Sequence, residues 1–205
     1  MPSVGATRLR KGSCIASQVS STSAKTAPSG ARTASRGSNR LRPNLMPSTS
    51  ADAPAAVGST LTYMNAAMSL TDWLMSGLFE KFPRLKIAYS EGQIGWIPYI
   101  LERADAVWED NRGWGGVADK VLRPPSEYYY EHVYGCFFDD AHGLKNLDAV
   151  GVNNVTFETD YPHSDSTWPH TKKVAEEIMK DLTQEQVDKI CRTNAIEMLH
   201  LDLDS

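Results

Sequence analysis

Three short apolar segments of the sequence each end in carboxylate side chains, and this placement is the first indication of chemistry. The segment ends read Ser90-Glu91-Gly92, Phe138-Asp139-Asp140 and Thr159-Asp160-Tyr161-Pro162-His163. Asp and His side chains are ligands that divalent metals accept, and a glutamate close to them can act as a general acid or base. The sequence therefore offers Glu91, Asp160 and His163 as candidates for metal-dependent or acid–base chemistry.

Each of these residues also has a purely structural explanation. The residues that follow Asp160 could form a turn and a helix cap, and Glu91 could bind the free amides of the next helix. Asp139 and Asp140 are expected to cap the helix that follows them. Spacing alone leaves the metal site and the structural explanation both open.

Alternating strands and helices are expected to position these side chains. Apolar spacing and β-branched or aromatic runs predict strands at 85–90, 132–138 and 155–159. Three- and four-residue apolar spacing predicts helices at about 69–81, 97–108, 141–149, 169–180 and 183–199, with a loop at 109–127. Ser69 with Asp72, and Thr183 with Gln186, are the expected helix caps.

Repeated strand–helix units imply an α/β fold with a parallel sheet covered by helices. The carboxyl ends of parallel strands meet at one edge, so the three polar segment ends are expected to lie together. A complete (β/α)8 barrel needs about 250 residues. About three units therefore predict either a portion of such a barrel or an open sheet.

The first 60 residues differ in composition from the rest of the chain. Residues 1–50 contain eight Lys and Arg, eleven Ser and no Asp or Glu. Such a segment has too little apolar surface to offset the entropy lost on ordering. We expect residues 1–60 to be a disordered, low-complexity basic segment and residues 61–205 to form the folded domain. The segment could be a solvated tail or a shifted reading frame, an organelle transit peptide, or a basic arm that binds RNA or a membrane.

The composition of the whole chain excludes several classes of protein. The 205 residues carry a net charge of −4, so a nucleic-acid partner is not expected. No run of about 18 apolar residues occurs, so a membrane partner is not expected either. Cys14, Cys136 and Cys191 are too far apart for a zinc pair or a disulfide framework. We expect a cytoplasmic protein with a small-molecule substrate, and a homo-oligomer is an open alternative.

Several segments resemble the amidohydrolase-related family, which includes aminocarboxymuconate-semialdehyde decarboxylase and aromatic-acid decarboxylases. The segments are GLFEKFPRLKI at 77–87, EGQIGWIPY at 91–99, NVTFETDYPH at 154–163 and Asn194-Ala195 in the last expected helix. Their joint order and spacing carry the resemblance, which covers about residues 65–200.

The resemblance implies a metal-dependent hydrolase or non-oxidative decarboxylase on a (β/α)8 TIM barrel, of which this chain matches the C-terminal portion. Asp160 matches the aspartate after the eighth strand that binds the metal, usually zinc, and takes part in catalysis. Glu91 occupies a position where some relatives carry a histidine acid or base. His163 is expected to touch the substrate or to support the ligands. The implied substrate is a small carboxylic acid, aromatic acids included.

The resemblance does not extend to the other metal ligands of the family. The family carries His-x-His on its first strand and a further histidine on its fifth, whereas the first histidine here is His132. A frameshift or truncation near Met46 would explain this difference. It would leave the zinc site incomplete, because catalytic zinc sites use about three protein ligands.

Two hypotheses therefore stand side by side. The first is a metal enzyme by descent that is inactive as this chain alone. The second is a non-catalytic remnant or interaction module, whose exposed sheet edge is covered by another chain or leads to aggregation.

Overall fold

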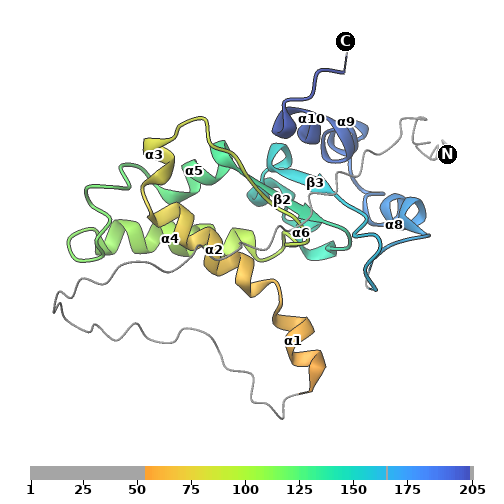
Figure 1. Ribbon diagram of the computed structural model, residues 1–205, viewed down its shortest axis with the longest axis horizontal. Coiled ribbons are helices and arrows are strands. Elements are labelled where there is room, and N and C mark those ends of the chain that lie inside the picture. The colour runs from red at the N-terminus through yellow and green to blue at the C-terminus, as the bar shows by residue number, and fades with distance from the viewer. Residues whose placement is uncertain (1–53, 165, 204–205) are drawn as a thin grey trace, which may run out of the picture. The chain divides into compact units, whose positions relative to one another are not determined.

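The computed structural model describes residues 54–164 and 166–203, in which three short strands alternate with helices (Figure 1). In chain order the elements are α1 (Ala55–Leu61), α2 (Met64–Met75), α3 (Leu78–Lys81), β1 (Ile87–Tyr89), α4 (Ile97–Asn111), α5 (Pro125–His132), β2 (Val133–Phe137), α6 (Ala141–Lys145), α7 (Leu147–Val150), the 3-10 turn η1 (Val152–Asn154), β3 (Val155–Phe157), α8 (Thr171–Ile178), α9 (Gln184–Asp188), the π-helical turn η2 (Lys189–Thr193) and α10 (Asn194–Leu199).

The three strands form one parallel sheet in the order β1-β2-β3. Ile87 lies opposite Val133 in the first pair of strands, and Gly135 lies opposite Val155 in the second. Parallel strands need a crossover connection, and here helices lie in both connections. The prediction of a parallel sheet built from three strand–helix units is confirmed.

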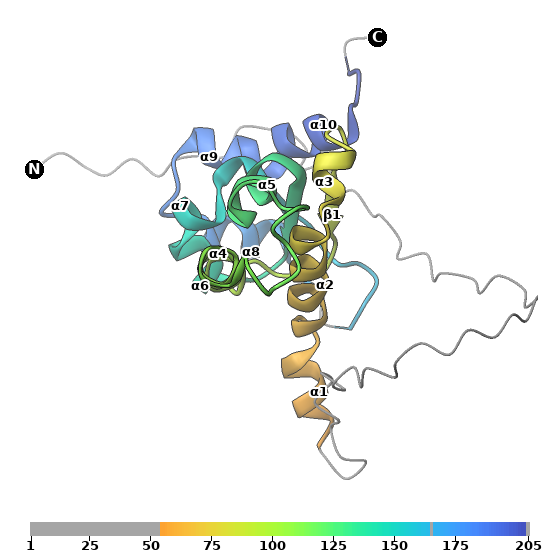
Figure 2. The same cartoon turned by 90° about the vertical axis from the view of Figure 1, so that its left-hand side faces the viewer.

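Helices α2, α4 and α5 pack on one another beside the sheet, as both views of the chain show (Figures 1 and 2). A glycine in the middle strand lets the segment leading into α4 come close. A Cβ at Gly135 would lie 2.8 Å from Ile94 Cγ2 and 3.1 Å from Ile97 Cδ1. Burial of each large apolar side chain contributes about 1.5–3 kcal/mol. The fully buried members of this core include Leu70, Leu74, Ile94, Ile97, Val133, Phe137 and Val155.

Two buried asparagines fix the start of β3. Asn154 Nδ2 donates hydrogen bonds to Val133 O at 2.8 Å and Tyr130 O at 2.9 Å. Asn194 Nδ2, from α10, donates to Val152 O and Val155 O, both at 2.7 Å. The two amides bind carbonyl groups of α5, η1, β2 and β3, and they tie the last helix to the strand that precedes Asp160.

Two local expectations are wrong and one is confirmed. Helix α5 occupies the end of the expected loop, because Tyr128 and Tyr129 pack into the core. Helix α2 begins before Ser69, which therefore lies inside the helix and does not cap it. The Thr183 cap is confirmed, since its Oγ1 accepts from Gln186 N at 3.2 Å and its N–H donates to Gln186 Oε1 at 2.9 Å.

Most of the segment 1–60 lies outside the described residues, so its expected disorder stays a prediction. Its last residues form α1, in which Thr60 Oγ1 donates to Ala56 O at 2.7 Å. Across residues 54–164 and 166–203, none of the helices has the length and hydropathy needed to cross a bilayer.

We expect Asn194→Ala to lower the free energy of unfolding by about 2–4 kcal/mol, because two buried carbonyl groups lose their donor. Urea denaturation followed by circular dichroism measures this loss. The control is Asn153→Ala, an exposed residue that accepts from Lys189 Nζ at 2.8 Å, and its expected cost is below about 0.5 kcal/mol. Equal losses in the two variants would contradict the role given to Asn194.

Candidate functional site

The carboxyl ends of β1 and β3 bring Glu91, Asp160 and His163 together. One possible ligand atom from each residue lies within 4.8 Å of the others. His163 Nδ1 lies 2.7 Å from Asp160 Oδ1 and 3.7 Å from Glu91 Oε1. Active sites of parallel α/β folds form at this end of the strands. The three candidates from the sequence therefore share one location, and their roles stay predictions.

The backbone at two of these residues is unusual. Glu91 has φ 56° and Asp160 has φ 55°, both in the left-handed region that residues other than glycine adopt rarely. The chain therefore turns sharply two residues after β1 and three residues after β3. The His163 N–H donates to Asp160 O at 2.9 Å, and Thr167 N donates to Thr159 O at 3.1 Å, which closes the loop after β3.

The three side chains differ in their exposure to solvent. The Asp160 side chain is 5% exposed, whereas those of His163 and Glu91 are 59% and 48% exposed. His163 Nδ1 donates to Asp160 Oδ1 at 2.7 Å. In the neutral ring this bond places the proton on Nδ1 and leaves Nε2 as the basic nitrogen. The carboxylate thus orients an accessible imidazole.

A further carboxylate, Glu158, lies next to this cluster and is not among the candidates from the sequence. It is 7% exposed and accepts hydrogen bonds from Ser90 Oγ at 2.9 Å and from the Glu91 N–H at 2.5 Å. Burial raises the pKa of Glu158 to about 7; the two hydrogen bonds oppose this rise, and the Glu91 and Asp160 carboxylates add to it. An acid directly after the buried residues of β3 is the sequence signal that could have identified it.

Asp140 holds the other end of the turn between β1 and α4. Its Oδ1 accepts from Gly143 N at 2.7 Å, so the expected cap of α6 is confirmed for this residue, whereas Asp139 is exposed and does not occupy the cap position. Its Oδ2 accepts from Ile94 N at 2.8 Å and from Gly95 N at 2.6 Å. These two contacts across the sheet were not expected from the sequence.

Two other reactive side chains near the strands have structural roles. Cys136 is 7% exposed, its Sγ lies 2.7 Å from Thr156 Oγ1, and burial raises its pKa to about 12. His132 stacks on Phe79 with ring centroids 4.4 Å apart, and its Nδ1 lies 2.7 Å from Leu85 O. Burial makes Cys136 a poor nucleophile at neutral pH, and the contacts of His132 hold its ring in the core.

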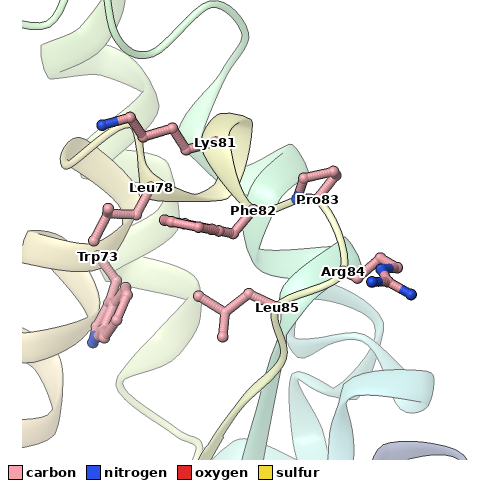
Figure 3. A pocket seen from close by; sticks show the side chains of 7 residues that line it. All are labelled: Trp73, Leu78, Lys81, Phe82, Pro83, Arg84 and Leu85. Atoms are coloured by element: carbon pink, nitrogen blue, oxygen red, sulfur yellow. The ribbon is translucent and has the colours of Figure 1, made fainter.

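A cavity of about 630 Å³ lies by the segment that leads into β1, away from the carboxylates (Figure 3). Its lining residues are Trp73, Leu78, Lys81, Phe82, Pro83, Arg84 and Leu85. In Figure 3 the Arg84 side chain points away from the apolar side chains. The lining contains no carboxylate and no imidazole, so this cavity does not contribute to the cluster.

Residues 49–201 match the family model described as Amidohydrolase. The chain belongs to this family. The match includes both strand ends that carry Glu91 and Asp160, and the resemblance found in the sequence is confirmed.

Solved structures share the fold at low sequence identity. An amidohydrolase from Mycobacterium avium subsp. paratuberculosis K-10 has a TM-score of 0.61 and 17% identity, over 72% of this chain and 36% of that chain. For 5-carboxyvanillate decarboxylase from Sphingomonas paucimobilis the TM-score is 0.58 and the identity 22%, over 68% of this chain and 41% of that chain. Dihydroxybenzoic acid decarboxylase from Polaromonas sp. JS666 was solved with manganese and the inhibitor 2-nitroresorcinol. Its TM-score is 0.54 and its identity 21%, over 72% of this chain and 47% of that chain.

The chain thus spans less than half the length of each of these structures. The assignment of its fold as a portion of a TIM barrel is confirmed, because α/β barrel amidohydrolases align with most of its length. The three strands and their helices supply one sector of the strand ends at which such a barrel builds its site.

We expect Cys136 to react with iodoacetamide at pH 8 about 1000-fold more slowly than in the unfolded chain, because its pKa lies near 12 instead of 9.0. The rate should rise about tenfold per pH unit up to pH 11, as the thiolate fraction grows. Peptide mass spectrometry of the alkylated protein measures both quantities. A rate that levels off near pH 9 in the folded protein would show that the thiol is not buried as described.

Proposed function

We propose that this chain carries part of the metal site of an enzyme that hydrolyses or non-oxidatively decarboxylates a small carboxylic acid. One observation carries the proposal: the ligand atoms of Glu91, Asp160 and His163 lie within 4.8 Å of one another at the carboxyl ends of the strands. Membership of the amidohydrolase family supports a metal-dependent reaction. The decarboxylases among the structural neighbours favour an aromatic acid as the substrate.

The donor set fits a divalent cation. The Asp160 and Glu91 carboxylates are ligands that manganese and zinc both accept. About three protein ligands are usual in catalytic zinc sites, so these two form only part of such a site. The sequence favours zinc, whereas the manganese bound to dihydroxybenzoic acid decarboxylase makes manganese the better first probe. No histidine precedes His132, so the earlier imidazole ligands of the family have no counterpart here. Glu91 would replace part of that set, while His163 keeps its hydrogen bond to Asp160.

Asp160 would be the principal ligand, since its carboxylate is 5% exposed and its backbone carbonyl accepts from the His163 N–H in the loop after β3. When bound, a divalent cation supplies a Lewis acid that withdraws electron density from a carboxylate or carbonyl oxygen of the substrate. Glu91 and His163 are each about half exposed, so Glu91 can reach the cation and His163 can reach a substrate that enters from solvent.

His163 would handle the proton of the reaction. Its Nδ1 is held by Asp160, which leaves Nε2 to exchange a proton with the substrate or with water. In decarboxylation the doubly protonated ring would donate its Nε2 proton to the carbon that loses CO₂. In hydrolysis the same nitrogen would accept a proton from the attacking water. The two reactions therefore need the same residues and differ in the substrate.

We expect the protein to bind about one Mn²⁺ per chain, and Asp160→Asn to weaken this binding at least about tenfold, because the variant loses the charge of the best-fixed ligand. Electron paramagnetic resonance of free Mn²⁺ measures the affinity. The control, Asp148→Asn, changes an exposed acid on α7 and should leave the affinity within about twofold. Equal affinities for both variants, or no binding of Mn²⁺ or Zn²⁺ by the unchanged chain, would refute the metal site.

With Mn²⁺ bound, we expect slow CO₂ release from 5-carboxyvanillate or 2,6-dihydroxybenzoate, the acids named for two of the structural neighbours. Asp160→Asn should abolish this release, because the ligand loses its charge and the hydrogen bond that orients His163 loses its charged acceptor. Coupled detection of CO₂ measures the rate. Tight Mn²⁺ binding without release of CO₂ or hydrolysis of ester or amide analogues would identify a non-catalytic remnant instead.

A further inference from the structure

The turn between β1 and α4 must be held in an uncommon conformation for the cluster to form. Glu91 at φ 56° and Gln93 at φ 53° are both left-handed residues that are not glycine. A turn of this kind is unfavourable for L-residues and persists only where surrounding contacts fix it. The position of the Glu91 carboxylate therefore depends on whatever holds this backbone.

Glu158 makes the contacts that hold the start of the turn. One carboxylate oxygen accepts from the Glu91 N–H at 2.5 Å and the other from Ser90 Oγ at 2.9 Å. These bonds link the end of β3 directly to the end of β1, although β2 lies between the two strands. The same residue that fixes the Glu91 backbone thus stands two positions before Asp160.

The burial of Glu158 argues against a passive role. The residue is 7% exposed, and burying a carboxylate is unfavourable unless hydrogen bonds compensate for the lost water. An apolar side chain would fill this position at lower cost if packing were the only requirement. An acid here supplies two acceptors on a rigid strand, aimed at a turn that needs them.

We propose that Glu158 is a positioning residue that sets the separation between the Glu91 carboxylate and Asp160. The inference rests on the proposed function for its effect on metal binding, but the contact itself does not depend on a metal. Asp140 provides an internal comparison, because it holds Ile94 N and Gly95 N at the far end of the same turn.

Three variants test this role by two measurements. In Glu158→Ala the Glu91 amide should exchange with solvent at least about tenfold faster, since its acceptor is lost, and Mn²⁺ affinity should fall about 10- to 100-fold. Glu158→Gln keeps an acceptor oxygen of the same shape, so it should retain most of the protection and lose less than about tenfold in affinity. Asp140→Asn should alter exchange at Ile94 and Gly95 and leave Mn²⁺ affinity within about threefold.

The measurements are amide exchange by nuclear magnetic resonance and Mn²⁺ titration by electron paramagnetic resonance. Loss of Mn²⁺ binding in Asp140→Asn as large as in Glu158→Ala would overturn the proposal, because general loosening of the turn would then explain both. Unchanged exchange at Glu91 in Glu158→Ala would overturn it as well. If Glu158→Ala fails to fold, Glu158→Gln decides. If Glu158→Gln kept full protection of the Glu91 amide from exchange but lost Mn²⁺ affinity, the proposal would be overturned. If the unchanged chain binds no Mn²⁺, the proposed function fails, and exchange at Glu91 still decides the positioning role.

Discussion

Carboxylates that accept hydrogen bonds from backbone N–H groups hold the functional end of this sheet together. The turn after β1 contains left-handed residues, so its amides cannot pair within a strand or a regular helix and need other acceptors. Glu158 supplies the acceptor for Glu91, and Asp140 supplies it for Ile94 and Gly95. Asp140 follows β2 and Glu158 follows β3. Hydrogen bonds to these side chains, and not the backbone hydrogen bonds of the sheet, therefore connect the turn to the other two strands. The position of the Glu91 carboxylate relative to Asp160 depends on the Glu158 contacts in particular.

The buried Glu158 carboxylate lowers the stability of the fold, but it fixes the position of the Glu91 backbone. Burial raises the pKa of Glu158 to about 7, which reports the cost of keeping a charged carboxylate out of water. A core of apolar side chains would avoid that cost. The packing of Ile94 and Ile97 against Gly135 supplies part of the stability that offsets it. Apolar packing on one face of the sheet thus offsets part of the cost of the buried Glu158 carboxylate at the edge of the sheet.

Apolar periodicity in the sequence predicted the three strands and the common edge of their polar ends, because these depend on local patterns. The position of Asp140 directly before an expected helix predicted its role as a cap, since a cap depends only on near neighbours in the chain. Helix α5 was missed because Tyr128 and Tyr129 become buried only against distant helices. The hydrogen bonds of Glu158 were missed for the same reason, because Ser90 and Glu158 are 68 residues apart.

The separation of the outer strands explains why the backbone matters more than the residue types. Neighbouring strands lie about 4.8 Å apart, so the ends of β1 and β3 would stand about 10 Å apart in a flat sheet. The ligand atoms nevertheless lie within 4.8 Å of one another. Side chains that continued along extended strands would alternate between faces and would not converge in this way. Left-handed turns at Glu91 and Asp160 redirect both carboxylates toward His163. An acid at either position would therefore join the cluster only while the backbone there keeps its left-handed conformation.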